Sequence, residues 1–253
     1  MTAPAYLRFL DKLGEIIEEL KKEEKENLQA AAENMADCIE REKMIHLWGP
    51  GGHSAIVAED ALYRKGGLAC INPIYDPTMS LSHGALLEIN HFEGMTGFAT
   101  LLLDYYGIEK DDVFIISNAF GASAGGVDLA LEIKKRGLFL IAISSAEAKK
   151  YYIKGHPLMH ESELVVPDIA DITISNHCIH GDGLVDIEGL EMRIGPVSTI
   201  MQSVVYQTLV AQTVELLVKR GLNPPIWVNA FDEGGIQKNN EYIQKYARRV
   251  KCL

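Results

Sequence analysis

Apolar residues follow two different patterns along the chain, and the change comes near residue 43. Over residues 5–42 they recur every three or four positions, as at Leu10, Leu13, Ile17 and Leu20, which is the spacing of one helix face. Further on, apolar runs without polar alternation occupy 44–48, 67–71, 113–117, 138–144 and 171–175. Such runs are typical of parallel strands covered on both faces. We therefore predict an N-terminal helical arm, residues 1–42, and an α/β domain, residues 43–253.

Helical patterns separate most of these runs and predict helices over 54–65, 80–106 and 125–136. The rest of the chain predicts a hairpin at 185–195, a long helix over 198–220 that Gly221 ends, a short strand at 226–230 and a last amphipathic helix over 238–250. The long helix is apolar on more than one face, which favours a subunit interface.

Composition narrows the class of protein. The 253 residues carry a formal net charge of −11, which argues against a nucleic-acid partner. No charge-free apolar stretch is long enough for a membrane span, and the chain starts with a charged amphipathic helix rather than a leader, so we expect no membrane partner. Four widely spaced cysteines without a CxxC pair predict reduced thiols, a cytoplasmic location and no zinc site: Cys38, Cys70, Cys178 and Cys252.

Two turns rich in glycine and serine each join a predicted strand to a predicted helix, at 49–54 and 117–123. Backbone N–H groups at such turns favour an anion, and two turns at one edge of a parallel sheet would hold the anionic end of a small molecule. We expect ligand contacts from both turns and from the end of the fourth strand: Gly51, Gly52, His53, Ser54, Ser117, Asn118, Gly121, Ser123, Ser144 and Ser145.

Carboxylates and histidines near these turns are candidates for proton transfer. Glu59 lies five residues after Ser54, so its side chain could face a ligand held at the first turn. A second cluster contains His83, His91 and Glu93, one of which could have a catalytic role. For Glu59, a surface carboxylate or a subunit contact remains an alternative interpretation. For the second cluster, a solvent-facing ion pair or a metal half-site remains one.

The remaining histidines carry weaker expectations. His177 and His180 flank Cys178, and we expect them in a pocket or subunit contact, because no second cluster completes a tetrahedral metal set. His156 and His160 lie in a predicted loop where lid residues are plausible. We expect no metal and no cofactor.

Several segments resemble the sugar isomerase (SIS) domain family. Gly49-Pro50-Gly51-Gly52-His53-Ser54, followed by Ala58-Glu59-Asp60-Ala61-Leu62-Tyr63-Arg64, resembles its first loop and helix. Ile116-Ser117-Asn118, with the helix pattern 127–132, is similar to its second. Gly181-Asp182-Gly183-Leu184-Val185 and Gly195-Pro196-Val197-Ser198-Thr199 resemble segments of stand-alone SIS proteins of this length. The resemblance covers roughly residues 40 to 235.

This resemblance implies a three-layer sandwich around a five-stranded parallel sheet. It also implies a homodimer or homotetramer with sites at the subunit interface, and a sugar phosphate bound without metal or nucleotide. A glutamate at the position of Glu59 moves the proton in related isomerases. The chain departs from the family in a longer first loop, where Ser54 is favoured over His53 as the binding serine, and in Ser117-Asn118-Ala119, where a hydroxyl is missing. A sulfonate or another acidic group therefore stands beside phosphate as the ligand anion.

The leading hypothesis is an aldose–ketose isomerase that acts on an anionic sugar through a cis-enediol, with Glu59 as base. A lyase, etherase or deglycase starting from the same proton abstraction is an alternative. A sugar-phosphate-binding regulator without catalysis is another. A dinucleotide enzyme fits poorly, because Ser54 stands where the third glycine of G-x-G-x-x-G is required.

Overall fold

The protein is built around one parallel β-sheet, seen in a computed structural model that describes residues 3–77, 80–84 and 91–253. Its five strands lie in the order β2-β1-β3-β4-β5, and every neighbouring pair is parallel. The strands are β1 (Ile45–Trp48), β2 (Ile71–Pro73), β3 (Val113–Ser117), β4 (Phe139–Ser144) and β5 (Ile172–Ser175). This sheet confirms the predicted α/β class.

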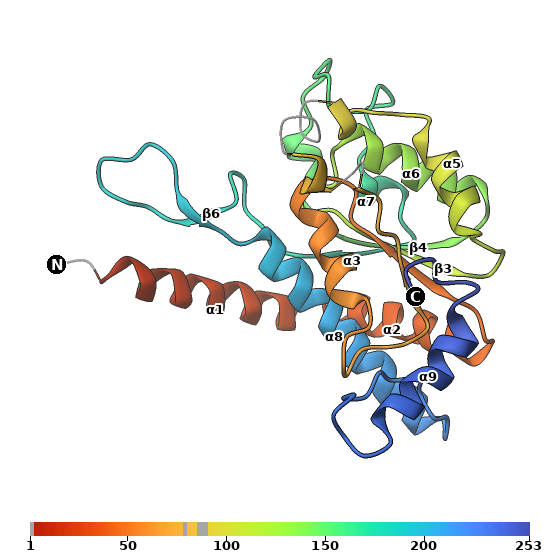
Figure 1. The fold of residues 1–253 in the computed structure, drawn as a ribbon. Helices are drawn as coiled ribbons and strands as arrows, with labels where there is room; N and C mark the ends of the chain where they lie inside the picture. The colour runs from red at the N-terminus through yellow and green to blue at the C-terminus, as the bar shows by residue number, and fades with distance from the viewer. Residues whose placement is uncertain (1–2, 78–79, 85–90) are drawn as a thin grey trace.

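Helices cover both faces of the sheet and produce three layers (Figure 1). One face packs against α2 (Lys25–Glu40) and α8 (Ser198–Lys219), with α3 (Ala55–Ala61) beside them. The other face packs against α5 (Phe98–Tyr106), α6 (Ala124–Lys135) and the short α7 (Val166–Ile169). The last helix, α9 (Gly235–Tyr246), adds Tyr246 to the first of these cores.

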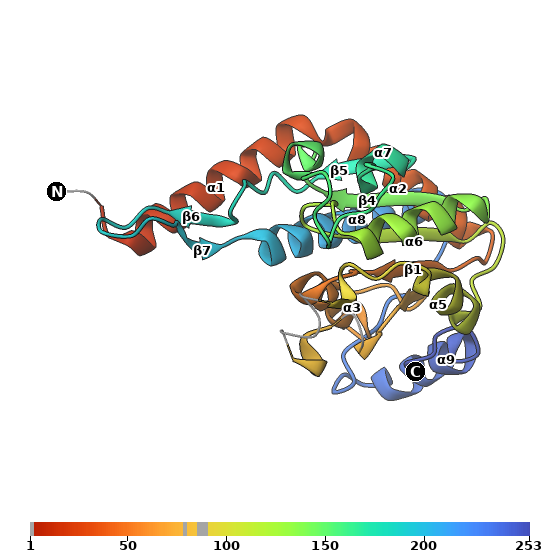
Figure 2. The same cartoon turned by 90° about the horizontal axis from the view of Figure 1, so that it is seen from above.

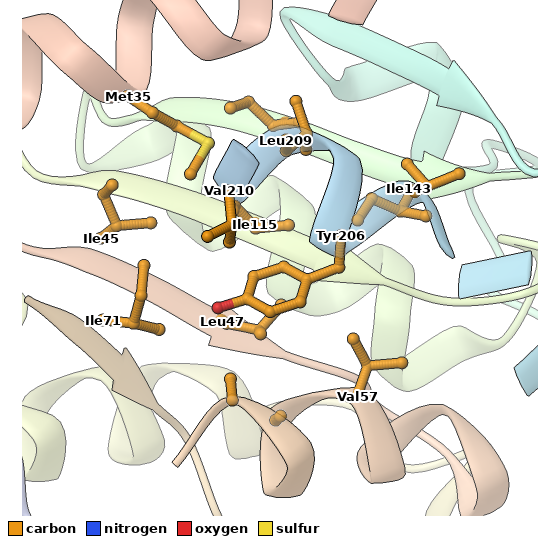
Figure 3. Packing of buried hydrophobic residues seen from close by; sticks show 14 of the residues in the cluster. Met35, Ile45, Leu47, Val57, Ile71, Ile115, Ile143, Tyr206, Leu209 and Val210 are labelled. Carbon is orange, nitrogen blue, oxygen red and sulfur yellow. The ribbon is translucent and has the colours of Figure 1, made fainter. Parts of the chain in front are cut away.

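The side chains of β1 alternate between the two faces of the sheet, and both faces are covered by apolar residues. Ile45 and Leu47 join the core under α2 and α8, whereas Trp48 joins the core under α5 and α6. Tyr206 of α8 extends over the sheet, and its ring lies beside Leu47 (Figure 3). Because apolar residues fill both faces, the strand sequences contain few polar positions, as the apolar runs predicted.

The N-terminal helix α1 (Ala5–Glu23) projects from the sandwich together with a hairpin (Figures 1 and 2). The hairpin consists of β6 (Gly183–Val185) and β7 (Ile194–Pro196), which are antiparallel. Arg8 and Lys12 donate hydrogen bonds to the carbonyls of Asp186 and Leu184, at 2.7 and 2.8 Å. The hairpin was predicted, but its position along α1 was not.

Other local predictions need correction. No continuous helix spans 80–106: a 3₁₀ turn, η3 (Leu81–His83), is followed by Gly84 with φ +93°, and α5 begins only after Gly97 with φ +80°. The second strand starts at residue 71 rather than 67, and the predicted strand at 226–230 is reduced to one bridge between Leu68 and Ile226. The glycines explain the first difference, because positive φ interrupts a helix.

The arm also differs in detail. Leu10, predicted to face the core, is 57% exposed, whereas Ile16 and Leu20 are buried. No helix among the described residues is long and apolar enough to cross a membrane. The division into an arm and a domain at residue 43 stays a prediction.

Candidate functional site

A cavity of about 360 Å³ opens at the edge of the sheet where β1 and β3 end. Both predicted turns, a segment before α5, a loop after β4 and the start of α8 form its walls. Its lining consists of Gly51, Gly52, His53, Ser54, Glu93, Asn118, Ala119, Phe120, Ala122, Ser123, His156, Leu158, Met159, Asp182 and Ser198. Seven residues predicted as site residues therefore meet around one cavity.

The first turn depends on glycine for close approach. A Cβ at Gly49 would collide with the Ser54 carbonyl. Gly51 has φ +106°, and a Cβ there would lie 2.5 Å from Oε1 of Glu93. The turn closes through the Ser54 N–H, which donates to the Gly51 carbonyl at 2.8 Å. The carboxylate of Glu93 thus fills the space that the missing side chain leaves.

Asn118 connects the two turns. Its Nδ2 donates to the Pro50 carbonyl at 2.8 Å and to Oγ of Ser123 at 3.2 Å, while its Oδ1 accepts the N–H of Gly121 at 2.8 Å. Both ends of the amide are engaged within the protein. Asn118 therefore positions the turns, and the proton of the Ser123 hydroxyl remains to be donated to a ligand.

The start of α6 is covered by the chain itself. The Ala124 N–H donates to the Leu158 carbonyl at 2.8 Å, and the Gly125 N–H donates to the Glu93 carbonyl at 2.9 Å. These two groups were expected to attract a ligand anion. Because they already have acceptors, the second turn offers fewer backbone donors than its sequence indicated.

Three predicted serine contacts lie beneath the cavity rather than on its wall. The Ser117 hydroxyl donates to Oε1 of buried Gln202 at 2.7 Å. Oγ of Ser144 is buried without a hydrogen-bond partner among the described residues, next to Gly121. Oγ of Ser145 accepts the Glu147 N–H at 3.2 Å. In one protomer, these hydroxyls support the strand ends, and their role as ligand contacts stays a prediction.

The comparisons with known proteins decide the family. A model of the SIS domain matches residues 8–145. The chain belongs to the SIS domain family. A UPF0309 protein of Thermoanaerobacter pseudethanolicus is 33% identical, covering 98% of this chain and 99% of its own. A UPF0309 protein of Geobacillus thermodenitrificans is 31% identical, covering 97% and 96%.

A solved structure shares the SIS fold. The phosphoheptose isomerase of Neisseria gonorrhoeae superposes with a TM-score of 0.51 at 15% identity, and the match covers 85% of this chain and 100% of that one. At this identity the likeness shows the fold alone. It agrees with the five-stranded parallel sheet and flanking helices described above.

Sequence reasoning missed several lining residues of this SIS domain, among them the polar residues Asp182 and Ser198. Asp182 and Ser198 line the cavity, although their side chains mainly serve the start of α8. Oδ1 of Asp182 accepts the N–H groups of Val197 and Ser198 at 2.9 and 2.7 Å, and its Oδ2 accepts the Ser198 hydroxyl at 2.8 Å. Both residues belong to the two glycine-containing segments that resemble stand-alone SIS proteins. That resemblance was the available signal.

Two of the other predicted catalytic side chains, Glu59 and His91, do not line the cavity. Glu59 is exposed on α3 and borders a separate surface cleft of about 700 Å³, together with Tyr63 and Asn229. His91 is exposed and does not line the cavity. His83 belongs to η3, but its side chain lies outside the described part of the structure. Catalytic roles for these three residues stay predictions.

The histidines that were predicted as lid, pocket or contact residues lie in different surroundings. His156 lines the cavity, and its Nδ1 accepts the Leu158 N–H at 3.2 Å, so Nε2 is the nitrogen left for a ligand. His177 faces Glu19 and Glu24, and His180 stacks on Tyr151. Within residues 3–77, 80–84 and 91–253, no group of three or more His, Cys, Asp or Glu is placed to hold a metal. Metal independence stays a prediction.

A second polar cluster lies at the opposite edge of the sheet, where the strands begin. His46 of β1 is fully buried between Oδ2 of Asp112, 2.9 Å from its Nε2, and Nδ2 of Asn72, 3.0 Å from its Nδ1. Arg249 donates to the same Oδ2 of Asp112 at 2.7 Å. We call His46, Asn72, Asp112 and Arg249 the amino-edge cluster.

The ionisation of the amino-edge cluster follows from its burial and contacts. Burial lowers the pKa of His46 below its ordinary 6.5, although Asp112 opposes this shift. Burial would raise the pKa of Asp112, but hydrogen bonds from His46 and from the N–H groups of Met44 and Glu109 hold that pKa below its usual range. A neutral imidazole with its proton on Nε2, donating to an ionised Asp112, fits these contacts.

Proposed function

We propose that the cavity binds an anionic sugar in its open-chain form and interconverts aldose and ketose through a cis-enediol. In this proposal Glu93 is the base that moves the proton between C1 and C2. One observation carries it: the Glu93 carboxylate lies against the glycine turn that borders the cavity, 2.5 Å from the position a Gly51 Cβ would take. Membership of the SIS family and a fold shared with a protein named phosphoheptose isomerase support the reaction class.

The reaction needs two kinds of proton movement. Glu93 takes the proton from C2, the carbonyl oxygen on C1 is protonated, and an enediol forms. The O2 hydroxyl then loses its proton while Glu93 returns the first proton to C1, which gives the ketose. His156 lines the same cavity, and its Nε2 is free to exchange protons with the two oxygens because Nδ1 is already occupied.

The choice of Glu93 over Glu59 rests on position within one protomer. Glu93 lines the cavity, whereas Glu59 borders a different cleft. A role for Glu59 requires a second copy that brings its carboxylate to a neighbouring cavity. The pair of variants described below separates the two assignments.

We further propose that a second copy covers the projecting arm. Tyr6 on α1 and Met192 in the hairpin are 66% and 71% exposed, and Leu10 and Leu190 are also exposed. A two-stranded hairpin with three-residue strands gains little stability alone, and exposed apolar side chains of this size favour an interface. Sedimentation velocity on the wild type and Met192→Glu tests this: the variant should dissociate, and a monomeric wild type would refute the contact.

The deciding experiment follows proton exchange at C2 in D₂O by NMR with a panel of anionic aldoses. The panel contains hexose 6-phosphates, amino-sugar phosphates, heptose phosphates and 6-sulfonated hexoses. We expect ketose to appear with deuterium at C1, and the remaining aldose to acquire deuterium at C2. Glu93→Gln should lower the exchange rate by about 10²–10⁴-fold, because Gln cannot accept the proton. Glu59→Gln is the matched control and should keep the wild-type rate.

Each other outcome of the exchange experiment indicates a different base or a different function. Loss of exchange in Glu59→Gln but not in Glu93→Gln would move the base to Glu59. Exchange with release of a substituent, and no ketose, would identify a lyase. Binding across the panel without exchange would contradict catalysis and favour a regulator.

A further inference from the structure

We propose that the turn at residues 229–235 forms an interface between two copies of this chain, in which Phe231 of each copy enters a surface cleft of the other. We call residues 229–235 the Phe231 turn. This contact lies apart from the arm contact proposed above, and it depends neither on catalysis nor on a bound ligand.

Hydrogen bonds hold the Phe231 turn in one conformation although it lies at the surface. Oδ1 of Asn229 accepts the Phe231 N–H at 3.3 Å, and its Nδ2 donates to Oδ1 of Asp232 at 3.0 Å. The Asn229 carbonyl accepts the Asp232 N–H at 3.1 Å. A Cβ at Gly235 would lie 2.1 Å from the same carbonyl, so glycine is required for this close approach. The position of Phe231 is therefore fixed by the backbone around it.

Phe231 itself is 98% exposed, more than any other large apolar residue in the part of the chain that the structure describes. An isolated exposed apolar residue on a protein surface is ordinary. Here, however, a hydrogen-bonded turn keeps the ring in water, where its hydration is unfavourable. An aromatic ring that is already fixed loses little conformational entropy on association, and such rings are typical anchors of protein interfaces.

The cleft of about 700 Å³ that Glu59 borders adjoins the Phe231 turn, and residues 228–230 form part of its lining. Leu62 and Tyr63, which follow α3, supply apolar surface to it. Tyr63 is 45% exposed, and its ring packs on Trp227 with the centroids 4.6 Å apart. Its φ of +50° is a left-handed conformation that is uncommon for a bulky residue, and such conformations cluster at binding sites. The cleft therefore offers an aromatic contact for the ring of a second copy.

The turn and the cleft also carry charges that can pair. Asp232 and Glu233 belong to the turn and are exposed. The cleft is bordered by four charged residues: Glu59, Asp60, Arg64 and Lys65. Arg64 and Asp60 form an ion pair at 2.8 Å, whereas Lys65 is an exposed cation. We expect Lys65 of one copy to pair with the acidic residues of the other. Because the cleft also holds negative charge, reversing the charge of Lys65 is the direct test of this pairing.

The adjacency of the Phe231 turn and the cleft identifies the partner as a second copy. In a two-fold contact the same patch of surface faces itself, so a projecting side chain and the cleft that receives it lie side by side on one protomer. Residues 228–230 line the cleft and Phe231 follows them directly, which is this arrangement. A single contact then buries two rings in two clefts. An unrelated partner would need only the ring or only the cleft.

The Phe231 turn leads into α9, which lies at the opposite end of the molecule from the projecting hairpin (Figures 1 and 2). Two-fold contacts on two separate surfaces of one protomer build a tetramer. Each copy then has one partner across the arm and another across the Phe231 turn. Glu59 belongs to the second of these contacts, which is one of the roles that its position in the sequence left open.

Sedimentation velocity on the full-length protein tests the contact, with Phe231→Asp as the deciding variant. We expect a wild-type tetramer, a dimer for Phe231→Asp, and a monomer when Met192→Glu is added to it. Replacing the ring by a charge should weaken the contact at least about 30-fold, the loss expected for an interface anchor. Tyr105→Asp is the matched control and should keep the wild-type mass, because Tyr105 on α5 is also an exposed aromatic residue. Far-UV circular dichroism checks that each variant is folded.

A charge swap tests whether the turn and the cleft meet directly. Lys65→Glu and Glu233→Lys should each weaken the contact about tenfold, because each substitution brings like charges together. The double variant should regain most of the lost affinity, since it restores the pair with its signs exchanged.

A monomeric wild type, an unchanged mass in folded Phe231→Asp, or a double charge variant that regains no affinity would overturn this inference. Dissociation of Tyr105→Asp would do so as well, because the loss would then not depend on the Phe231 turn. A wild-type dimer that Phe231→Asp converts to a monomer would retain this contact and remove the arm contact. None of these measurements uses a sugar, so their failure leaves the proposed reaction intact, and a protein that binds no sugar would leave this contact intact.

Discussion

The two edges of the sheet carry similar polar residues in opposite conditions. At the amino edge, His46, Asn72 and Asp112 are buried and bonded to one another, and Arg249 supplies the countercharge. At the carboxyl edge, Glu93, His156 and Ser123 border an open cavity, and Nε2 of His156 and the hydroxyl proton of Ser123 remain for a ligand. A histidine–carboxylate pair with short contacts thus occurs outside the cavity described above.

The difference between the two edges shows how to distinguish polar residues that stabilise the fold from polar residues that can bind a ligand. Asp112 accepts from His46, Arg249 and the backbone N–H groups of Met44 and Glu109, which leaves no capacity for a ligand. Glu93 faces a space large enough for a sugar. Saturated polar groups stabilise the fold, whereas polar groups beside a cavity are available for binding and proton transfer.

Asp112→Asn is expected to have the largest effect on stability. The substitution removes the buried charge that pairs with Arg249. Breaking a buried ion pair costs about 3 kcal/mol of the free energy of unfolding at the low end, which applies here because Arg249 keeps an ion pair with Glu109 at 3.2 Å. Denaturant unfolding measures the loss. Asp111→Asn is the matched control, because Asp111 is adjacent, exposed and in a left-handed conformation that Asn tolerates.

If the two edges of the sheet act independently, the loss of stability in Asp112→Asn should not change ligand affinity. At a temperature where Asp112→Asn remains folded, its affinity for an anionic sugar should equal that of the wild type. A large loss of affinity in the folded variant would mean that the two edges are coupled and would break the distinction.

Asn118→Ala should have an intermediate effect on stability and a clear one on binding. Removing the amide leaves the Pro50 carbonyl and the Gly121 N–H without partners, which costs about 1–3 kcal/mol. Because the same amide positions both turns, ligand affinity should fall by about tenfold, which corresponds to about 1.4 kcal/mol.

Calorimetric titration and thermal unfolding of Asn118→Ala measure these two losses. Asn223→Ala serves as control, since Asn223 is exposed and remote from the cavity lining. A variant that loses stability but binds as well as the wild type would show that the turns keep their geometry without Asn118.

Most of the architecture could be predicted from the sequence because burial leaves a strong pattern. The strand runs, the hairpin and the long helix α8 lie close to their predicted places, since apolar periodicity reports directly on which faces are covered. The prediction of one helix over 80–106 was wrong for the residues that the structure describes. Glycines with positive φ interrupt the helix there despite the helical periodicity of the sequence.

The site was predictable only in part. The turns were recognised, and six of their predicted residues meet at the cavity together with Glu93. Pattern alone could not show that the Ser117 hydroxyl would turn to Gln202 or that Glu59 would face another cleft, because both depend on how distant segments pack. The amino-edge cluster was missed for the same reason: His46 lies within an apolar run, and its partners are distant in sequence.

The smallest expected effect is the pH dependence of stability that His46 imposes. Its pKa in the folded protein is lowered from 6.5 by burial, against the attraction of Asp112 and Glu109 and with the help of Arg249. As the pH falls through about 6.5, His46 therefore becomes protonated in the unfolded chain but stays neutral in the folded chain. The contribution of His46 to the free energy of unfolding is therefore fully present above about pH 6.5. It falls as the pH is lowered, by at most about 1.4 kcal/mol per pH unit.

Denaturant unfolding between about pH 7.5 and about pH 5.5 measures this slope around the ordinary histidine pKa. His46→Gln should flatten it, because Gln carries no titrating proton, whereas His91→Gln, at an exposed position, should keep it. In the folded wild type, the NMR signals of the His46 ring should not titrate over this range. A His46 ring that titrates near pH 6.5 would show that the amino-edge cluster admits a proton, and the contrast between a closed edge and an open one would then fail.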